Sequence, residues 1–156
     1  LLAEVCKWIL QNTSYQLAFI GAPVDRKKID AFINTYFDKE AQLKIKNNAN
    51  DLSFENYYSF LYRECAALLT IDSAPLHIAK KLSVPTLSLW GPTNPLNLSK
   101  VDKRNLVYYL AKNCSPCLHH TETLPCKGDN ICMKDMDKDV IIAHFSKLLD
   151  TIRQAE

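Results

Sequence analysis

The chain has 156 residues, of which 47% are hydrophobic and 23% charged, and these proportions are ordinary for a soluble globular protein. Its 19 basic and 17 acidic residues leave a formal net charge of +2, which provides no strong field for holding nucleic acid. No apolar run reaches the roughly 18 residues of a membrane-spanning helix. Composition therefore favours one cytoplasmic globular domain and argues against disordered, fibrous and nucleic-acid-binding classes.

The first residues, LLAEVCKWILQN, place apolar side chains at helical spacing and contain no initiating Met. We therefore expect the chain to begin inside a helix and to be a piece of a longer protein. The later apolar runs and turn signals predict strands and helices that alternate along the sequence. The expected strands are 16–21, 43–45, 67–71, 84–90 and 106–110, and the expected helices are 29–36, 53–65, 75–82 and 137–154.

Alternating strands and helices predict an α/β fold with a parallel sheet flanked by helices. Ligands of such sheets bind beyond the carboxyl ends of the strands, so the loops GAPVD, NNAND, DSAPLH and GPTNP are the candidate binding segments. The sequence has only three glycines and lacks both the GxGxxG fingerprint and the phosphate-binding GxxxxGK[ST] loop. A conventional dinucleotide dehydrogenase or a P-loop kinase is therefore disfavoured.

The DSAPLH segment lies between a buried strand and a short helix, and it has two interpretations. Asp72 or Ser73 could simply cap the helix, with Pro75 in the first turn where no N–H is needed. Alternatively, the N–H groups at this helix start are aimed at a phosphate. The residues around the segment decide between these interpretations.

The longer stretch DSAPLHIAKKLSVPTLSLWGPTNP resembles the signature of glycosyltransferase family nine, the ADP-heptose:lipopolysaccharide heptosyltransferases. That signature has an acid, a Ser or Thr and a small residue, then His-hydrophobic-Ala, a strand and GPT-x-P. The resemblance extends upstream through GAPVD and downstream through CSPC and CMKDM, so it covers essentially the whole chain. Ala74 departs from the glycine of many members without removing a polar group.

The resemblance implies a B-type glycosyltransferase, in which two Rossmann-like domains enclose the active site. Residues 1–156 would be the C-terminal nucleotide-sugar-binding domain, without its first strand and without the N-terminal acceptor domain. The donor would be an ADP-sugar and the acceptor the lipopolysaccharide inner core. The catalytic base would lie outside this chain, and the chain alone would be inactive. The location implied is cytoplasmic, with peripheral attachment of the full-length protein to the inner membrane as an option.

The resemblance also suggests roles for individual residues. The amides of Ser73, Ala74 and Leu76, with the Ser73 hydroxyl, would stabilise the charge of a departing diphosphate without any metal. Asp72 would contact the sugar or orient the loop, and His77 would touch phosphate or sugar or bond to a backbone carbonyl. Asp25, four residues after the glycine that ends its strand, could accept ribose hydroxyls or could simply be a solvated acid at a helix start. Weaker candidates are Asn50 and Asp51 for the nucleoside, and Thr93 and Asn94 in the next loop.

Four of the six cysteines fall in the loop 114–132, as Cys114-x2-Cys117-x8-Cys126-x5-Cys132. Four soft ligands suit a structural zinc ion, although the spacing is not a repeated CxxC pair. Disulfides and free thiols remain open as alternatives. The loop also supports a second hypothesis for function, a non-catalytic zinc-stabilised α/β binding module in which DSAPLH only caps a helix.

Overall fold

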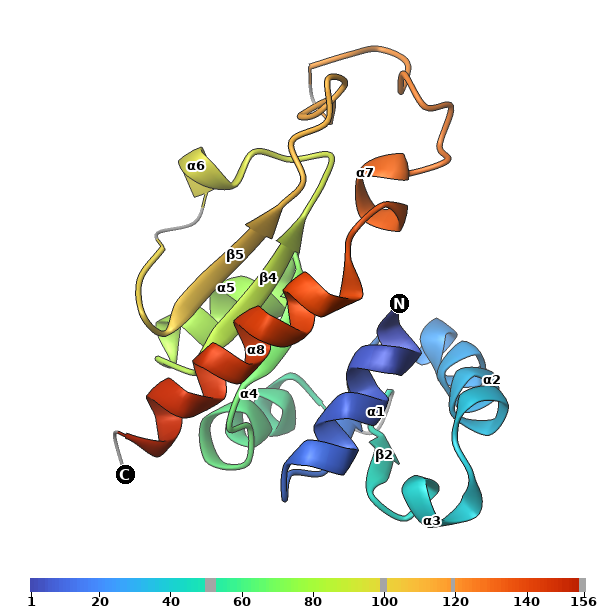
Figure 1. Cartoon of the computed structure of the whole chain (residues 1–156), viewed down its shortest axis with the longest axis vertical. Coiled ribbons are helices and arrows are strands. Elements are labelled where there is room, and N and C mark those ends of the chain that lie inside the picture. Colours follow the sequence, from blue (N-terminus) through green and yellow to red (C-terminus); the bar gives the residue numbers. More distant parts are fainter. Residues whose placement is uncertain (50–52, 99–100, 119, 155–156) are drawn as a thin grey trace. The chain divides into compact units, whose positions relative to one another are not determined.

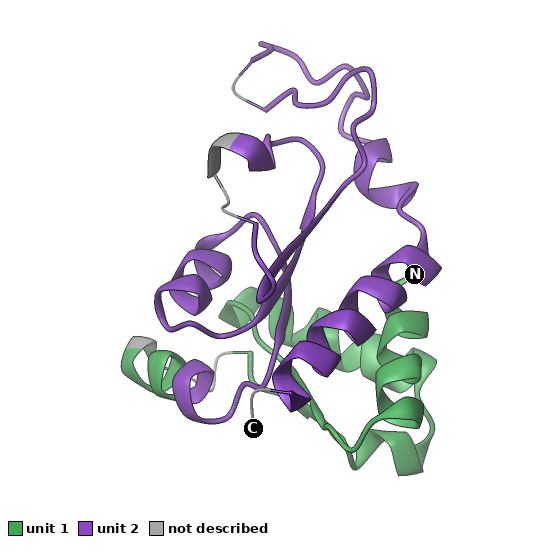
Figure 2. Cartoon of the chain, turned by 60° about the vertical axis from the view of Figure 1, so that its left-hand side comes forward, with its two compact units in different colours: residues 1–59 green, residues 60–156 purple. Residues whose placement is uncertain are grey.

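The computed structural model describes residues 1–49, 53–98, 101–118 and 120–154. These residues divide into two compact units, residues 1–59 and 60–156, which are coloured separately in Figure 2. Helix α4 (Phe54–Arg63) contains the boundary between them. No helix in the described ranges combines the length and the apolar character that crossing a membrane requires.

The first unit contains a small parallel sheet covered by helices. Strands β1 (Leu17–Phe19) and β2 (Ile45–Asn47) pair in parallel, with Leu17 opposite Ile45. The apolar stripe of α1 buries Cys6 and Leu10, which cluster with Phe37, because side chains three or four residues apart share one helix face. The helical elements of this unit are α1 (Leu2–Asn12), the 3-10 turn η1 (Pro23–Asp25), α2 (Arg26–Tyr36) and α3 (Lys39–Gln42).

The second unit is built on a parallel three-stranded sheet in the order β3-β4-β5. Strands β3 (Leu68–Ile71), β4 (Thr86–Trp90) and β5 (Asn105–Tyr109) pair with Leu68 opposite Thr86 and Thr86 opposite Asn105. Because β4 is the central strand, four of its five residues are buried. Helix α5 (Ala74–Lys81) and helix α8 (Lys138–Arg153) lie on opposite faces of this sheet (Figure 1).

Apolar stripes hold these two helices against the sheet. Helix α5 buries Leu76 and Ala79, and it ends near Ser83, whose φ of 58° reverses the chain into β4. Helix α8 buries Ile141, Phe145, Leu148 and Leu149 at helical spacing, and Asp137 caps it by accepting the Asp139 N–H. Two one-turn helices complete the unit, α6 (Pro95–Leu98) and α7 (Ile131–Lys134).

The parallel α/β fold expected from the sequence is confirmed, with three differences. The weak strand expected at 43–45 forms at Ile45–Asn47 instead, because Lys39–Gln42 turns into a short helix before it. The described strands form two sheets rather than one. The short helices α3, α6 and α7 were not expected, because four residues are too few to show a helical period.

Candidate diphosphate site at the start of helix α5

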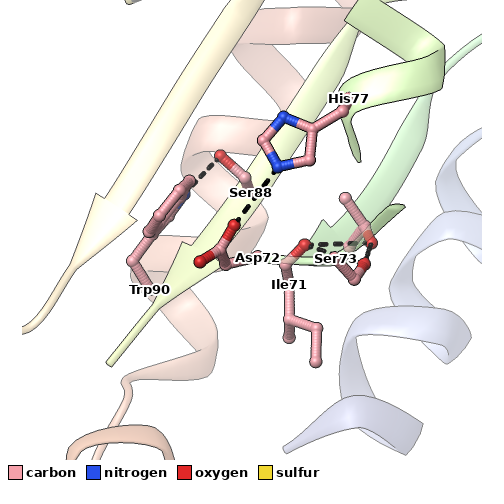
Figure 3. Close-up of polar contacts among 7 residues, drawn as sticks. Ile71, Asp72, Ser73, His77, Ser88 and Trp90 are labelled. Atoms are coloured by element: carbon pink, nitrogen blue, oxygen red, sulfur yellow. Dashed lines mark hydrogen bonds and ion pairs between the residues drawn. The ribbon is translucent and has the colours of Figure 1, made fainter. Parts of the chain in front are cut away.

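The chain leaves β3 at Ile71 and enters α5 at Ala74, so the sharp turn between them consists of Asp72 and Ser73. Ser73 is the N-cap residue by position and has extended backbone angles, φ −164° and ψ 168°. Its hydroxyl does not cap the helix. The hydroxyl donates instead to the Ile71 carbonyl at 3.2 Å and lies 3.4 Å from the Thr70 hydroxyl (Figure 3).

The backbone amides of this turn are not all available to a ligand. Pro75 has no N–H, and the Leu76 N–H already donates to the Ser73 carbonyl at 3.0 Å. Leu76 is also fully buried, so it is a poorer donor to a phosphate than the sequence suggested. The N–H groups of Ser73 and Ala74 donate to no other described residue, which leaves these two amides as the candidate anion donors.

Asp72 and His77 face each other across the start of α5 (Figure 3). The His77 Nε2 atom lies 3.6 Å from Asp72 Oδ1, which is too long for a direct hydrogen bond but close enough for an ion pair when the imidazole is protonated. The Asp72 side chain is 20% exposed and that of His77 is 52% exposed. The turn therefore presents one carboxylate and one solvent-facing imidazole beside the two amides.

A buried polar contact lies in the neighbouring strand β4. The Trp90 indole N–H donates to Ser88 Oγ at 2.8 Å, and the Ser88 hydroxyl donates to the Leu106 carbonyl of β5 at 3.2 Å. Ser88 and Trp90 are both almost completely buried, and Figure 3 shows them beside Asp72. The contact satisfies the indole and links the central strand to its neighbour.

The candidate nucleoside residues lie in the first unit. The Asp25 Oδ2 atom accepts the Ala22 N–H at 3.0 Å, so this carboxylate already closes the turn that follows β1. Asn50 and Asp51 lie outside the described residues. The sequence analysis did not single out Arg26. Its guanidinium donates to the carbonyl of Ala49, the residue before Asn50, at 2.9 Å. In the sequence, only its position directly after the candidate Asp25 pointed to Arg26.

The loop after β4 contains Thr93 and Asn94, both partly exposed. The Asn94 Oδ1 atom accepts the Leu96 N–H at 2.9 Å, so it caps the short helix α6. This contact gives Asn94 a structural role, and a ligand-binding role for either residue stays a prediction.

All six cysteines are free thiols in the structure. Cys117 and Cys132 are buried, whereas Cys114 and Cys126 are partly exposed. Within the described residues, which leave out His119, no group of three or more histidine, cysteine, aspartate or glutamate side chains is placed so that it could hold a metal ion. The expected zinc ion therefore stays a prediction.

The chain shares its α/β fold with two solved glycosyltransferase structures, each of which is much longer than this chain. The chain matches a solved structure of the Escherichia coli ADP-heptose lipopolysaccharide heptosyltransferase II with a TM-score of 0.77 and 20% identity, over 96% of this chain and 41% of that one. A family 9 glycosyltransferase from Veillonella parvula matches with a TM-score of 0.70 and 19% identity, over the same shares. Both matches establish the α/β fold.

Residues 3–127 match the model of Glycosyltransferase family 9 (heptosyltransferase), and the chain belongs to this family. It is 30% identical to lipooligosaccharide heptosyltransferase 2 of Campylobacter jejuni serotype O:6 over 111 residues, which are 70% of this chain and 34% of that protein. It is also 30% identical to lipopolysaccharide heptosyltransferase 2 of E. coli K12 over 60% of this chain and 26% of that protein. The chain thus spans about a third or less of the length of these curated relatives.

Proposed function

We propose that this chain is the donor-binding domain of a heptosyltransferase that transfers heptose, or a related sugar, from an ADP-sugar to the lipopolysaccharide inner core. One observation carries the proposal. The N–H groups of Ser73 and Ala74 at the start of α5 are unpaired among the described residues, and Asp72 and His77 flank them. Family membership and the names of the relatives supply the reaction and the substrate class.

The chemistry of sugar transfer fits this turn. Departure of the nucleoside diphosphate places negative charge on its terminal phosphate, and fixed N–H donors at a helix start stabilise that charge as it grows. His77, if protonated, adds a positive charge beside the same position. Asp72 is an anion and would repel the diphosphate, so its role is toward the sugar or toward holding His77 in place.

The substitution Ala74→Pro tests the amide directly. Proline at the first helical position removes one N–H and keeps a helical φ, and the extended backbone of Ser73 suits a residue before proline. We expect ADP affinity to fall about tenfold or more, the equivalent of at least about 1.4 kcal/mol for a charge-assisted bond. Ala74→Gly keeps the N–H and is the matched control.

The outcome also separates the two classes of function. Unchanged ADP affinity in folded Ala74→Pro protein would remove this turn from the diphosphate site. A binding module without nucleotide chemistry would show no measurable affinity for ADP or an ADP-sugar in either variant or in the unmodified protein, and the proposal would then be wrong.

The catalytic base, in this proposal, belongs to a part of the enzyme that the 156-residue chain does not include. Asp72 is the only carboxylate of the DSAPLH turn, and it lies on the donor side. The chain alone should therefore transfer no heptose to a lipid A–Kdo acceptor, whereas the full-length protein should transfer it. Robust turnover by the chain alone would place the base within these residues.

A further inference from the structure

Two hydroxyl groups lie against one backbone carbonyl where β3 ends. The Ser73 hydroxyl donates to the Ile71 carbonyl at 3.2 Å (Figure 3), and the Thr70 hydroxyl lies 3.3 Å from the same oxygen. The two hydroxyl oxygens are 3.4 Å apart, and either hydroxyl could donate to the other. Three oxygen atoms therefore form a small triangle at the turn between β3 and α5.

The triangle gives the Ile71 carbonyl a choice of donors. Each hydroxyl has one proton, which rotates about the C–O bond, and each hydroxyl can also accept a hydrogen bond. All three distances exceed about 2.8 Å, the commonest separation for O–H···O bonds, so no single bond in the triangle is strong. The carbonyl can thus keep one hydroxyl donor when the other proton turns away.

The Ser73 hydroxyl is placed where a second acceptor could draw it away from Ile71. It makes no capping bond to α5, so the helix does not hold it. Ser73 also supplies one of the two candidate amide donors, and Ala74 supplies the other. A phosphate on these amides would lie within one residue of a hydroxyl whose present acceptor has another donor at hand.

We propose that Thr70 is a positioning residue of the diphosphate site and acts through Ser73, an inference that rests on the proposed function. When the diphosphate binds, the Ser73 hydroxyl turns its proton from the Ile71 carbonyl to a phosphate oxygen. The Thr70 hydroxyl then donates to the carbonyl that Ser73 has released. Only hydrogen bonds are exchanged, and Thr70 itself does not touch the ligand.

The exchange strengthens binding because a hydrogen bond to an anionic oxygen is about twice as strong as one between neutral groups. Loss of a donor to the Ile71 carbonyl would offset part of this gain, and the Thr70 hydroxyl prevents that loss. The strand alone does not require the hydroxyl, since valine is as well suited as threonine to a β-strand. The hydroxyl is therefore the group to remove.

Calorimetry with ADP on the full-length protein tests the exchange through a double-mutant cycle. Thr70→Val keeps the β-branched shape and replaces the hydroxyl with a methyl group, and we expect ADP binding to weaken about threefold or more. In the Ser73→Ala background no hydroxyl needs to be released, so Thr70→Val should change ADP affinity there by less than about twofold. Thr70→Ser keeps a hydroxyl and should bind ADP as the unmodified protein does. The control Thr151→Val removes a hydroxyl that donates to the Lys147 carbonyl in α8 and should leave ADP affinity unchanged.

The outcomes separate this role from a structural one and from the proposed function. Equal weakening by Thr70→Val with and without the Ser73 hydroxyl would overturn the proposal, because it would mean that Thr70 does not act through Ser73. Unchanged affinity in Thr70→Val, with Ala74→Pro still weakening ADP binding, would overturn the role of Thr70 and leave the diphosphate site in place. Absence of ADP binding by the unmodified protein would overturn both. Thr70→Ala, which also lacks the hydroxyl, takes the place of Thr70→Val in the cycle if the valine variant does not fold.

Discussion

The His77 imidazole faces the Asp72 carboxylate at 3.6 Å, next to Ser73 and Ala74, whose amides donate to no other residue that the structure describes. In the proposed function, the turn would combine amide donors that attract a diphosphate with a carboxylate that repels it. This combination suits a site that must hold a nucleotide-sugar and then release a nucleoside diphosphate, because the carboxylate disfavours the more negative product.

Removal of the carboxylate charge should consequently separate binding from transfer. In Asp72→Asn we expect ADP to bind about fivefold more tightly, the equivalent of about 1 kcal/mol between charges near a surface, while heptose transfer falls. Calorimetry with ADP and a transfer assay on the full-length protein would measure the two effects. Asp150→Asn removes a charge from α8 and is the control. Weaker ADP binding in Asp72→Asn would show that Asp72 supports the diphosphate.

The strand–turn–helix unit at 68–81 could be predicted from the sequence because every local signal agrees. The run ALLTI is apolar, and Asp72, Ser73 and Pro75 are typical residues of a helix start. The expected burial of this strand on both faces was wrong at its end, where Ile71 is 54% exposed. The hydrogen bonds of the turn could not be predicted. Whether the Ser73 hydroxyl bonds to a helix N–H or back to Ile71, and whether the Leu76 amide is free, depend on backbone angles that residue types do not determine.

The contacts of the cysteine loop 114–132 were even harder to predict from the sequence. Its spacing indicated a cluster of thiols, but nothing in the sequence connected Cys117 and Cys132 to Gly91–Pro92, which is more than 20 residues away. The sequence left Asp25 equally open to binding a ribose and to lying in solvent at a helix start, whereas its carboxylate in fact accepts the Ala22 N–H. Individual side-chain contacts and the one-turn helices α3, α6 and α7 thus escaped prediction, whereas the strands and the longer helices did not.

The Ser88–Trp90 contact should contribute to stability through the satisfaction of a buried group. In Ser88→Ala the indole N–H keeps its place without an acceptor, and we expect the free energy of unfolding to fall by about 1 to 3 kcal/mol. The double variant Ser88→Ala/Trp90→Phe removes donor and acceptor together. In denaturant unfolding, the double variant should lose less unfolding free energy than the two single variants lose together, because the two groups are coupled. Strict additivity would show that the bond contributes nothing.

Gly91 should be intolerant of even a methyl group. A Cβ atom there would come within 2.7 Å of both Cys132 Sγ and Met133 Sδ, so Gly91→Ala should displace α7 and cost about 1 to 3 kcal/mol by overpacking. Gly21→Ala is a matched control, because its Cβ would lie 3.1 Å from Asp25 and requires a smaller shift. Thermal unfolding and hydrogen exchange at 131–134 would measure the difference. Equal effects of the two substitutions would contradict the close approach at Gly91.

Burial of the Cys6 thiol predicts how stability changes at alkaline pH. Burial raises the pKa of Cys6 from 9.0 to about 12, and the side chain is only 4% exposed. Above pH 9 the unfolded chain loses this proton while the folded chain keeps it, so the unfolded state binds fewer protons and stability falls as pH rises toward 12. The steepest loss is about 1.4 kcal/mol per pH unit.

The substitution Cys6→Ala should remove this loss, in exchange for a packing cost that does not depend on pH. Unfolding free energies of the two proteins, measured in reducing buffer from pH 8 to 11, should therefore converge as pH rises. Cys65→Ala should show the same sign over a narrower range, because burial raises the pKa of Cys65 to about 11. Parallel curves for Cys6→Ala and the unmodified protein would mean that this thiol reaches solvent, which would contradict its place in the cluster with Leu10 and Phe37.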